Sequence, residues 1–193
     1  MKNYTDEDTL DMMKNFGGFD KCPFGKVGTK EHEIMSDIMN GKLNFESEEI
    51  IFDRKKIFDK FSIMLPENAV MTSDSSEEKD YVEYEFDEGN ILFVLERYDN
   101  EIKFYGIDEF IDFFTSEMTK EDEELEFVSI GSKIIKAKEI GYFDFIVEEE
   151  IYCYTFVLSI KEQMYVGKIF IQDKYEDCCI PMAQGITNTL YVE

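Results

Sequence analysis

The residues of this sequence that could do chemistry are few and widely separated. Histidine occurs once, at His32, and the nearest cysteine in the sequence is Cys22. A thiol within hydrogen-bond reach of an imidazole can act as a nucleophile, so a thiol-dependent enzyme using Cys22 and His32 is one hypothesis. A loop containing glycine and proline separates the two residues, and an exposed helical position is the simpler interpretation of His32.

The other cysteines and the acids carry weaker signals. Cys178 and Cys179 are adjacent, a spacing that does not suit chelation of one metal ion, and we expect one thiol to be buried and one exposed. Cys153 lies in an apolar strand and should be buried. Asp144 stands between two phenylalanines, and we expect it to face solvent or a strand edge rather than a substrate.

The charge balance of the chain is extreme. The sequence has 44 acidic residues against 20 Lys plus Arg, a net charge of −24. It offers no basic stripe for a nucleic acid, and an anionic membrane surface would repel it. Solubility through self-repulsion and recognition of a basic protein partner both remain open. Two acidic runs form the expected partner-binding surface: Glu121, Asp122, Glu123, Glu124, Glu148, Glu149 and Glu150.

Motifs for cofactors and targeting are missing from the sequence. The acidic runs lack the ligand spacing of an EF-hand, and the glycine-containing stretch 25–30 lacks the spacing of a phosphate-binding loop, so we expect no cofactor. The N-terminus is acidic and carries no secretory signal, and no apolar run is long enough to span a bilayer. Together with cysteines suited to a reducing compartment, this predicts a cytoplasmic, bacterial protein.

The elements that position these residues fall into two parts. Residues 1–55 are predicted to form an N-terminal appendage of helix and loop, with Thr29 capping a helix that runs to Met39. Residues 56–193 are predicted to form one α+β domain. Its fold class is an antiparallel β-sheet flanked by helices on both faces, an α/β/α sandwich, because several strands are apolar on every residue and need cover on both sides.

The expected elements of the domain follow from periodicity and turn residues. Alternating apolar residues predict a strand that Pro66 ends, and residues 71–80 read as a polar loop. An apolar stripe predicts a helix over 106–120. Short connections among the later strands predict antiparallel neighbours. The expected elements are strands 61–65, 81–86, 91–95, 127–140, 142–147, 151–160 and 164–172 and a closing helix over about 176–192.

Several of these segments together resemble the PsbP/DcrB-like superfamily. They are the opening strand Phe61-Ser62-Ile63-Met64-Leu65-Pro66-Glu67, the hairpin strand Ile91-Leu92-Phe93-Val94, the helix start Ile107-Asp108-Glu109-Phe110, the strands Gly141–Phe145 and Tyr152–Leu158, and the closing Ile186–Leu190. The resemblance covers residues 56–193. This chain departs from the pattern by lacking both a secretion signal and tryptophan.

The resemblance implies binding rather than catalysis. The superfamily includes a photosystem subunit, a Ran-binding import factor and chaperones for secreted effectors. We therefore expect a non-enzymatic protein-interaction domain, accessory to other proteins or of the effector-chaperone or immunity type, that binds a basic partner. A small-molecule or metal-ion binding module and the thiol-dependent enzyme remain alternatives.

Overall fold

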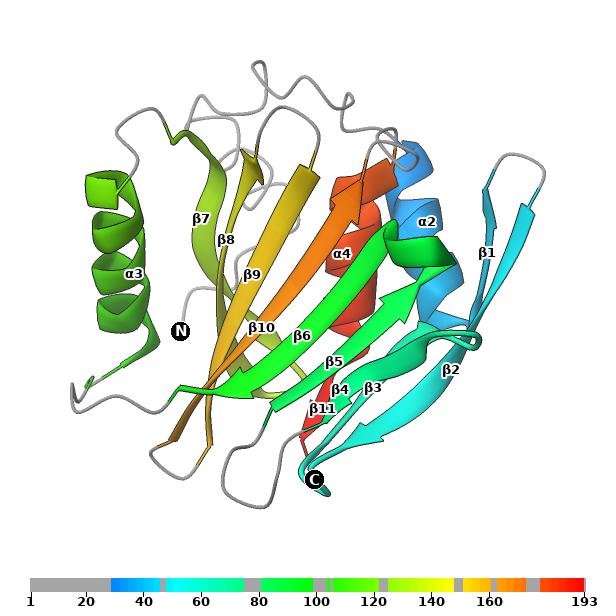
Figure 1. The fold of residues 1–193 in the computed structure, drawn as a ribbon, viewed down its shortest axis with the longest axis horizontal. Coiled ribbons are helices and arrows are strands. Elements are labelled where there is room, and N and C mark those ends of the chain that lie inside the picture. Colours follow the sequence, from blue (N-terminus) through cyan, green and yellow to red (C-terminus); the bar gives the residue numbers. More distant parts are fainter. Residues whose placement is uncertain are drawn as a thin grey trace, which may run out of the picture.

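The computed structural model describes residues 29–45, 48–74, 81–98, 104, 106–121, 125–147, 151–160, 163–172 and 178–192. Within them, two antiparallel sheets pack with three α-helices and a short 3₁₀-helix (Figure 1). In chain order the elements are α2 (Thr29–Met39), β1 (Lys42–Phe45), β2 (Glu48–Ile57), β3 (Phe61–Pro66), β4 (Val70–Asp74), β5 (Tyr81–Phe86), η2 (Asp87–Gly89), β6 (Ile91–Arg97), α3 (Ile107–Glu121), β7 (Phe127–Ile135), β8 (Lys138–Val147), β9 (Ile151–Ile160), β10 (Gln163–Gln172), α4 (Cys179–Asn188) and β11 (Tyr191–Val192).

The larger sheet has seven strands in the order β4-β5-β6-β10-β9-β8-β7. All its neighbouring strands are antiparallel, as the short connections predicted. The predicted β5–β6 hairpin is confirmed, with Phe86 opposite Ile91. One pair is formed by strands distant in the sequence, β6 and β10, and it leaves β4 and β7 at the two edges of the sheet.

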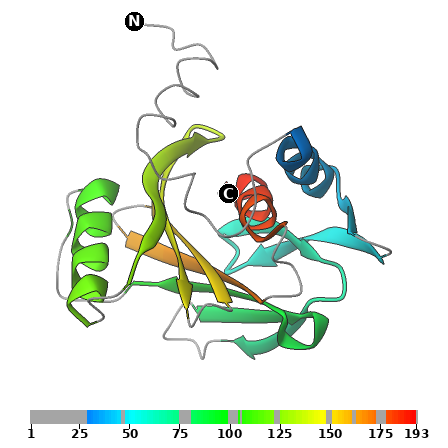
Figure 2. The same cartoon turned by 90° about the horizontal axis from the view of Figure 1, so that it is seen from above.

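Strand β9 lies in the core because both of its faces are covered. Cys153 and Val157 point to one face and belong to the two clusters that form around α3. Tyr154 and Phe156 point to the other face and belong to the main cluster, which includes residues of α4. Figure 2 shows α3 and α4 on different sides of these strands. Cover on both sides explains why the strand is apolar on almost every residue.

The smaller sheet, in the order β1-β2-β3-β11, corrects the prediction of a single sheet. The expected opening strand exists as β3, but it pairs with β2 and β11 instead of joining the larger sheet. The two sheets pack against each other, with the Phe61 ring edge-on to that of Tyr165 at 4.8 Å between centroids. The α+β class and the antiparallel pairing are therefore confirmed. The predicted α/β/α sandwich with helices on both faces is not confirmed, because α4 shares its face of the larger sheet with the second sheet.

The N-terminal part also differs from its prediction. The helix expected from Thr29 to Met39 is confirmed, but the residues after it form β1 and β2 rather than helix or loop. Buried Ile50, Phe52 and Ile57 in β2 account for this, because all three belong to the main core cluster. Strand β2 runs across the expected boundary at residue 55. That residues 1–55 form a separate appendage stays a prediction.

Three further elements depart from the sequence-based expectation. The strand expected over 127–140 is a hairpin, β7 and β8, that turns at Lys136 and Ala137. Both turn residues have positive φ, +47° and +65°, as a two-residue hairpin loop requires. Part of the expected loop 71–80 is strand β4, and the closing helix ends at Asn188 because the chain then pairs with β3 as β11.

Candidate functional site

An open acidic groove lies where the two sheets meet. Its volume is about 420 Å³. The start of β2, the turn between β3 and β4 and the end of β5 supply its walls. The lining residues are Glu48, Glu49, Ile50, Ile51, Glu67, Asn68, Phe86 and Asp87. Four acidic residues and three apolar residues therefore contribute to the lining of the groove.

Local structure holds the three segments of the groove in place. The Glu67 N–H donates to the Ile51 carbonyl at 2.7 Å, which ties the β3–β4 turn to β2. On the opposite wall, the Asn90 side-chain amide donates to the backbone carbonyl and the carboxylate of Asp87. Asp87 and Glu88 both adopt left-handed φ angles near +55° (+53° and +56°), a conformation that costs non-glycine residues roughly 1–2 kcal/mol each. This wall of the groove is therefore a strained turn that the Asn90 side chain holds through two hydrogen bonds.

The groove combines negative charge with accessible apolar surface. Ile51 is 48 % exposed and supplies most of this apolar surface, while the largely buried Phe86 also lines the groove. Glu49 forms an exposed ion pair with Lys42, with 2.5 Å between Oε2 and Nζ, and exposed pairs contribute little to stability. Lys55 donates to the Glu67 carbonyl oxygen at 3.1 Å, not to its carboxylate. Such a surface suits a ligand that carries both cations and an apolar side chain.

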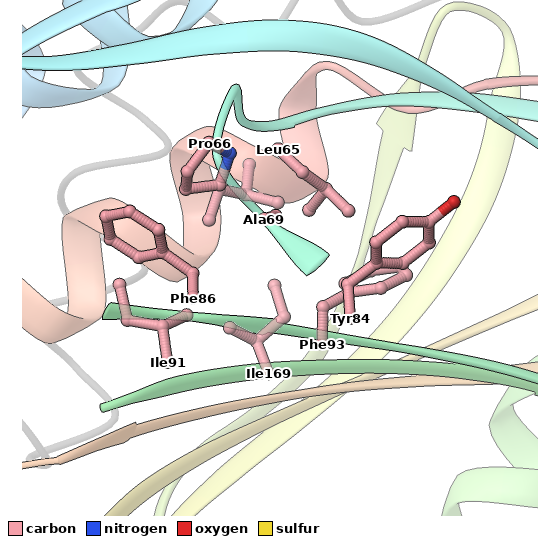
Figure 3. A pocket seen from close by; sticks show the side chains of 9 residues that line it. Leu65, Pro66, Ala69, Tyr84, Phe86, Ile91, Phe93 and Ile169 are labelled. Atoms are coloured by element: carbon pink, nitrogen blue, oxygen red, sulfur yellow. The ribbon is translucent and has the colours of Figure 1, made fainter. Parts of the chain in front are cut away.

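Phe86 also separates the groove from a small apolar cavity between the sheets. Figure 3 shows Leu65 and Pro66 on one side of this cavity and Phe93 and Ile169 on the other. The volume of the cavity is about 10 Å³, at the lower limit for one water molecule, and its lining offers water no polar partner. This cavity is too small for a metabolite, so it does not support the alternative of a small-molecule site.

Asp144 occupies a buried polar network on the face of the larger sheet that packs against α4. It is 1 % exposed, which makes the expectation of a solvent-facing or edge position wrong. Ser129 Oγ and the Tyr152 hydroxyl each donate to its carboxyl group at 2.5 Å. Burial raises the pKa of Asp144, and these hydrogen bonds offset part of that increase. The buried carboxyl group is not accessible to a substrate, and we assign a structural role to Asp144.

Lys133 lies at the margin of the same network. Its ammonium group is 5.6 Å from the ring centroid of Tyr142 and 5.7 Å from that of Tyr154, and it donates to Asn188 Oδ1 at 3.1 Å. Burial lowers the pKa of Lys133 to about 8. The Tyr154 hydroxyl is buried and has no hydrogen-bond partner among the described residues. The network therefore brings Asp144 and Lys133 into contact with the tyrosines that lie beneath α4.

The described thiols and the histidine do not form a catalytic group. Cys178 and Cys179 are both buried, so the prediction of one exposed thiol is wrong. Cys153 is buried as expected, and burial raises its pKa to about 12, which keeps the thiol protonated and unreactive at neutral pH. His32 lies exposed on α2, and Cys22 is outside the described residues. The Cys22–His32 enzyme stays an untested prediction.

The predicted partner-binding runs lie mostly outside the described residues. Glu121 is exposed at the end of α3, whereas Asp122, Glu123, Glu124 and Glu148–Glu150 are not described. The groove acids were missed because they come from three segments distant in the sequence, and no single-sequence signal brings them together. Among described side chains, no three of the His, Cys, Asp and Glu groups converge as a metal site. No described helix combines the length and hydropathy needed to cross a bilayer.

Comparison with known proteins supports the fold and leaves the family open. The sequence matches no family model and no curated protein. The chain has the fold of PsbP: the solution structure of cyanobacterial PsbP (CyanoP) from Synechocystis sp. PCC 6803 aligns with a TM-score of 0.54 at 9 % identity, over 78 % of this chain and 98 % of that one. The predicted PsbP/DcrB-like fold is thereby confirmed.

Two structures from Pseudomonas aeruginosa are more distantly similar. PA94, a protein of unknown function, aligns with a TM-score of 0.40 at 10 % identity, over 72 % of this chain and 96 % of that one. The immunity protein TplEi of a type VI secretion system, in complex with a peptide, aligns with a TM-score of 0.44 at 13 % identity, over 87 % of this chain and 64 % of that one.

Proposed function

We propose that this protein is a non-enzymatic interaction domain that binds a basic segment of a protein partner in the acidic groove. The observation that carries the proposal is the placement of Glu48, Glu49, Glu67 and Asp87 around Ile51 and Phe86. Carboxylates attract lysine and arginine side chains and orient them, while the apolar floor can bury one hydrophobic residue between them. The proposed ligand is therefore a peptide with basic residues on both sides of an apolar one.

The charge of the whole chain supports the same partner. A net charge of −24 attracts a basic protein from a distance and speeds its association, and it repels acidic competitors. The buried thiols and the buried Asp144 offer no accessible reactive group in the described part of the chain. The buried thiols at positions 153, 178 and 179 also suit a reducing compartment, and we propose the bacterial cytoplasm as the location of the protein. An accessory role, as chaperone or immunity protein, fits this mode of binding.

The proposal is tested by calorimetry with a synthetic peptide in which lysines and arginines flank a central leucine. A charge-reversal variant, Glu48→Lys with Glu67→Lys, should weaken peptide binding at least about tenfold, because opposite charges in the groove are replaced by like charges. Replacing the leucine by serine should also weaken binding, because the apolar floor then gains no partner.

The matched control carries the same change in net charge on the exposed face of α3. Asp112→Lys with Glu117→Lys should weaken binding less than about threefold. Circular dichroism of both variants establishes that they remain folded. If the two double variants lose affinity equally, binding depends on net charge alone and the groove is not the site.

A further inference from the structure

Strand β7 leaves an apolar edge of the larger sheet exposed. It is the last strand in the sheet order, and β8 is its one neighbour among the described strands. Ile130 is 51 % exposed and Ile134 is 78 % exposed, and both lie on the face where α3 packs over β8 and β9. The main contacts of α3 are with β8 and β9, and they leave these two isoleucines of β7 exposed. An open strand edge beside exposed isoleucines is a template for pairing with another strand.

Within the described part of the chain, the usual features that protect a strand edge are not found at this one. Strand β7 contains no proline, and its one charged residue, Lys133, points to the opposite face, where it donates to Asn188. The β-bulge is confined to the start of the strand, between Phe127 and Ser129. From Ser129 to Ile135 the strand is regular, with a continuous backbone edge.

The charges at the two ends of β7 indicate what pairs with it. Exposed Glu126 precedes the strand, and exposed Lys136 and Lys138 lie at the turn that follows it. Between Glu126 and Glu139 the sequence has no acidic residue, in a chain of net charge −24. A second copy of this strand placed antiparallel brings unlike charges together at both ends, whereas a parallel copy brings like charges together.

We propose that two copies of this protein associate through antiparallel pairing of their β7 edges, on a two-fold axis that passes by Ser132. In this register Ile130 lies opposite Ile134 of the second copy, and Glu126 lies opposite Lys138 of the second copy. The pairing covers the exposed isoleucines and joins the two larger sheets into one. The same surface serves both copies, as a two-fold interface requires.

Salt separates this association from binding in the groove. The net charge of −24 on each copy opposes dimer formation, and salt screens that repulsion. Dimerisation should therefore strengthen as sodium chloride is raised, while binding of a basic peptide should weaken. Because the two surfaces respond in opposite directions, either proposal can fail without the other.

The first experiment is a disulfide crosslink at the two-fold axis. Directly opposed residues in antiparallel strands have Cβ atoms about 4.5–5.5 Å apart, and a backbone shift of about 1 Å brings them to the roughly 3.5–4.5 Å of a disulfide. In a Cys22→Ser background, Ser132→Cys should form a covalent dimer under mild oxidation at least about tenfold faster than Ser116→Cys, an exposed position on α3. The three described cysteines are buried and should not contribute.

The second experiment is sedimentation equilibrium in about 0.5 M salt. Ile134→Lys should raise the dimer dissociation constant at least about tenfold, because it places a charge opposite an isoleucine. Val70→Lys is the matched control, since Val70 is 63 % exposed on β4 at the other edge of the sheet, and it should leave the constant unchanged.

Three results would overturn the proposal. One is a wild-type protein that remains monomeric at about 0.5 mM, the result also expected if β7 accepted a strand from a different protein. The others are a dimer that Ile134→Lys does not weaken, and a Ser132→Cys variant that crosslinks no faster than Ser116→Cys.

Discussion

At the scale of single residues, Asp144 shows how a charged group becomes part of a core. The sequence places it between Phe143 and Phe145, so a strand position could be predicted, but the direction of its side chain could not. Its burial depends on Ser129 from β7 and Tyr152 from β9, which supply two hydroxyl donors across neighbouring strands. Those donors lie at sequence separations of 15 and 8 residues, and only the sheet register brings them to the carboxyl group.

The raised pKa of Asp144 predicts a pH-dependent cost to stability. The folded chain holds this proton to a higher pH than the unfolded chain, whose Asp pKa is about 3.9. The contribution is fully present below that value and is lost as pH rises through the folded pKa. The Asp144→Asn variant has no proton to lose at this position, so its unfolding free energy lacks this pH-dependent contribution. The unfolding free energy of wild type relative to Asp144→Asn should therefore fall as the pH is raised above about 4.

Urea unfolding followed by far-UV circular dichroism measures this difference, since the chain has no tryptophan for fluorescence. Asp112→Asn, at an exposed position on α3, is the control for the loss of one carboxyl group from the chain. A difference between wild type and Asp144→Asn that stays constant from pH 4 to pH 7 would contradict a raised pKa at this residue.

At the scale of elements, hydrophobic periodicity was sufficient to predict helices and hairpins that form from neighbouring residues. It was not sufficient to predict pairing between strands that are distant in the sequence. The β5–β6 hairpin and α3 could be predicted because turn residues or an apolar stripe mark them in the sequence. The β7–β8 turn could not, since Lys136 and Ala137 adopt positive φ without the Gly, Asn or Asp that usually marks such loops. The pairing of β3 with β2 and β11 depends on partners that local patterns do not specify.

The contact between α3 and the larger sheet requires a residue without a side chain on β8. A Cβ added at Gly141 would lie 2.3 Å from both Ile107 Cγ2 and Ile111 Cδ1. Gly141→Ala should therefore lower the free energy of unfolding by about 1–3 kcal/mol through overpacking. Chemical denaturation measures the change. Gly106→Ala, with nothing within 4 Å of the added Cβ, should change stability by less than about 0.5 kcal/mol.

A double variant establishes whether the Gly141 contact is the cause. Ile111→Val removes the Cδ1 atom that the new methyl group would meet, so it should recover part of the stability lost in Gly141→Ala. If Gly141→Ala and Gly106→Ala destabilise equally, or if Ile111→Val adds to the loss, close packing of α3 on β8 is not what limits this position.

At the scale of the whole molecule, the fold and the charge have separate origins. The fold is that of PsbP at 9 % identity, so it depends on the pattern of buried apolar residues rather than on particular ones. Composition left both self-repulsion and a basic partner as explanations of the charge. The groove could not be located from the sequence because its acids come from Glu48 and Glu49, Glu67 and Asp87 in three separate segments. The shape of the groove therefore depends on tertiary contacts, while the long-range electrostatic field of the chain follows from its composition.

The net charge of −24 makes stability itself dependent on salt. Mutual repulsion of carboxylates is greater in the compact chain than in the expanded one, so it opposes folding. Raising sodium chloride from about 0.01 M to 0.1 M shortens the screening length from about 30 Å to about 10 Å. The midpoint of urea unfolding should therefore rise over this range. Asp112→Lys with Glu117→Lys, which carries four fewer net negative charges, should show a smaller rise. Equal rises in both proteins would mean that salt acts through specific ion binding or solvation rather than through screening.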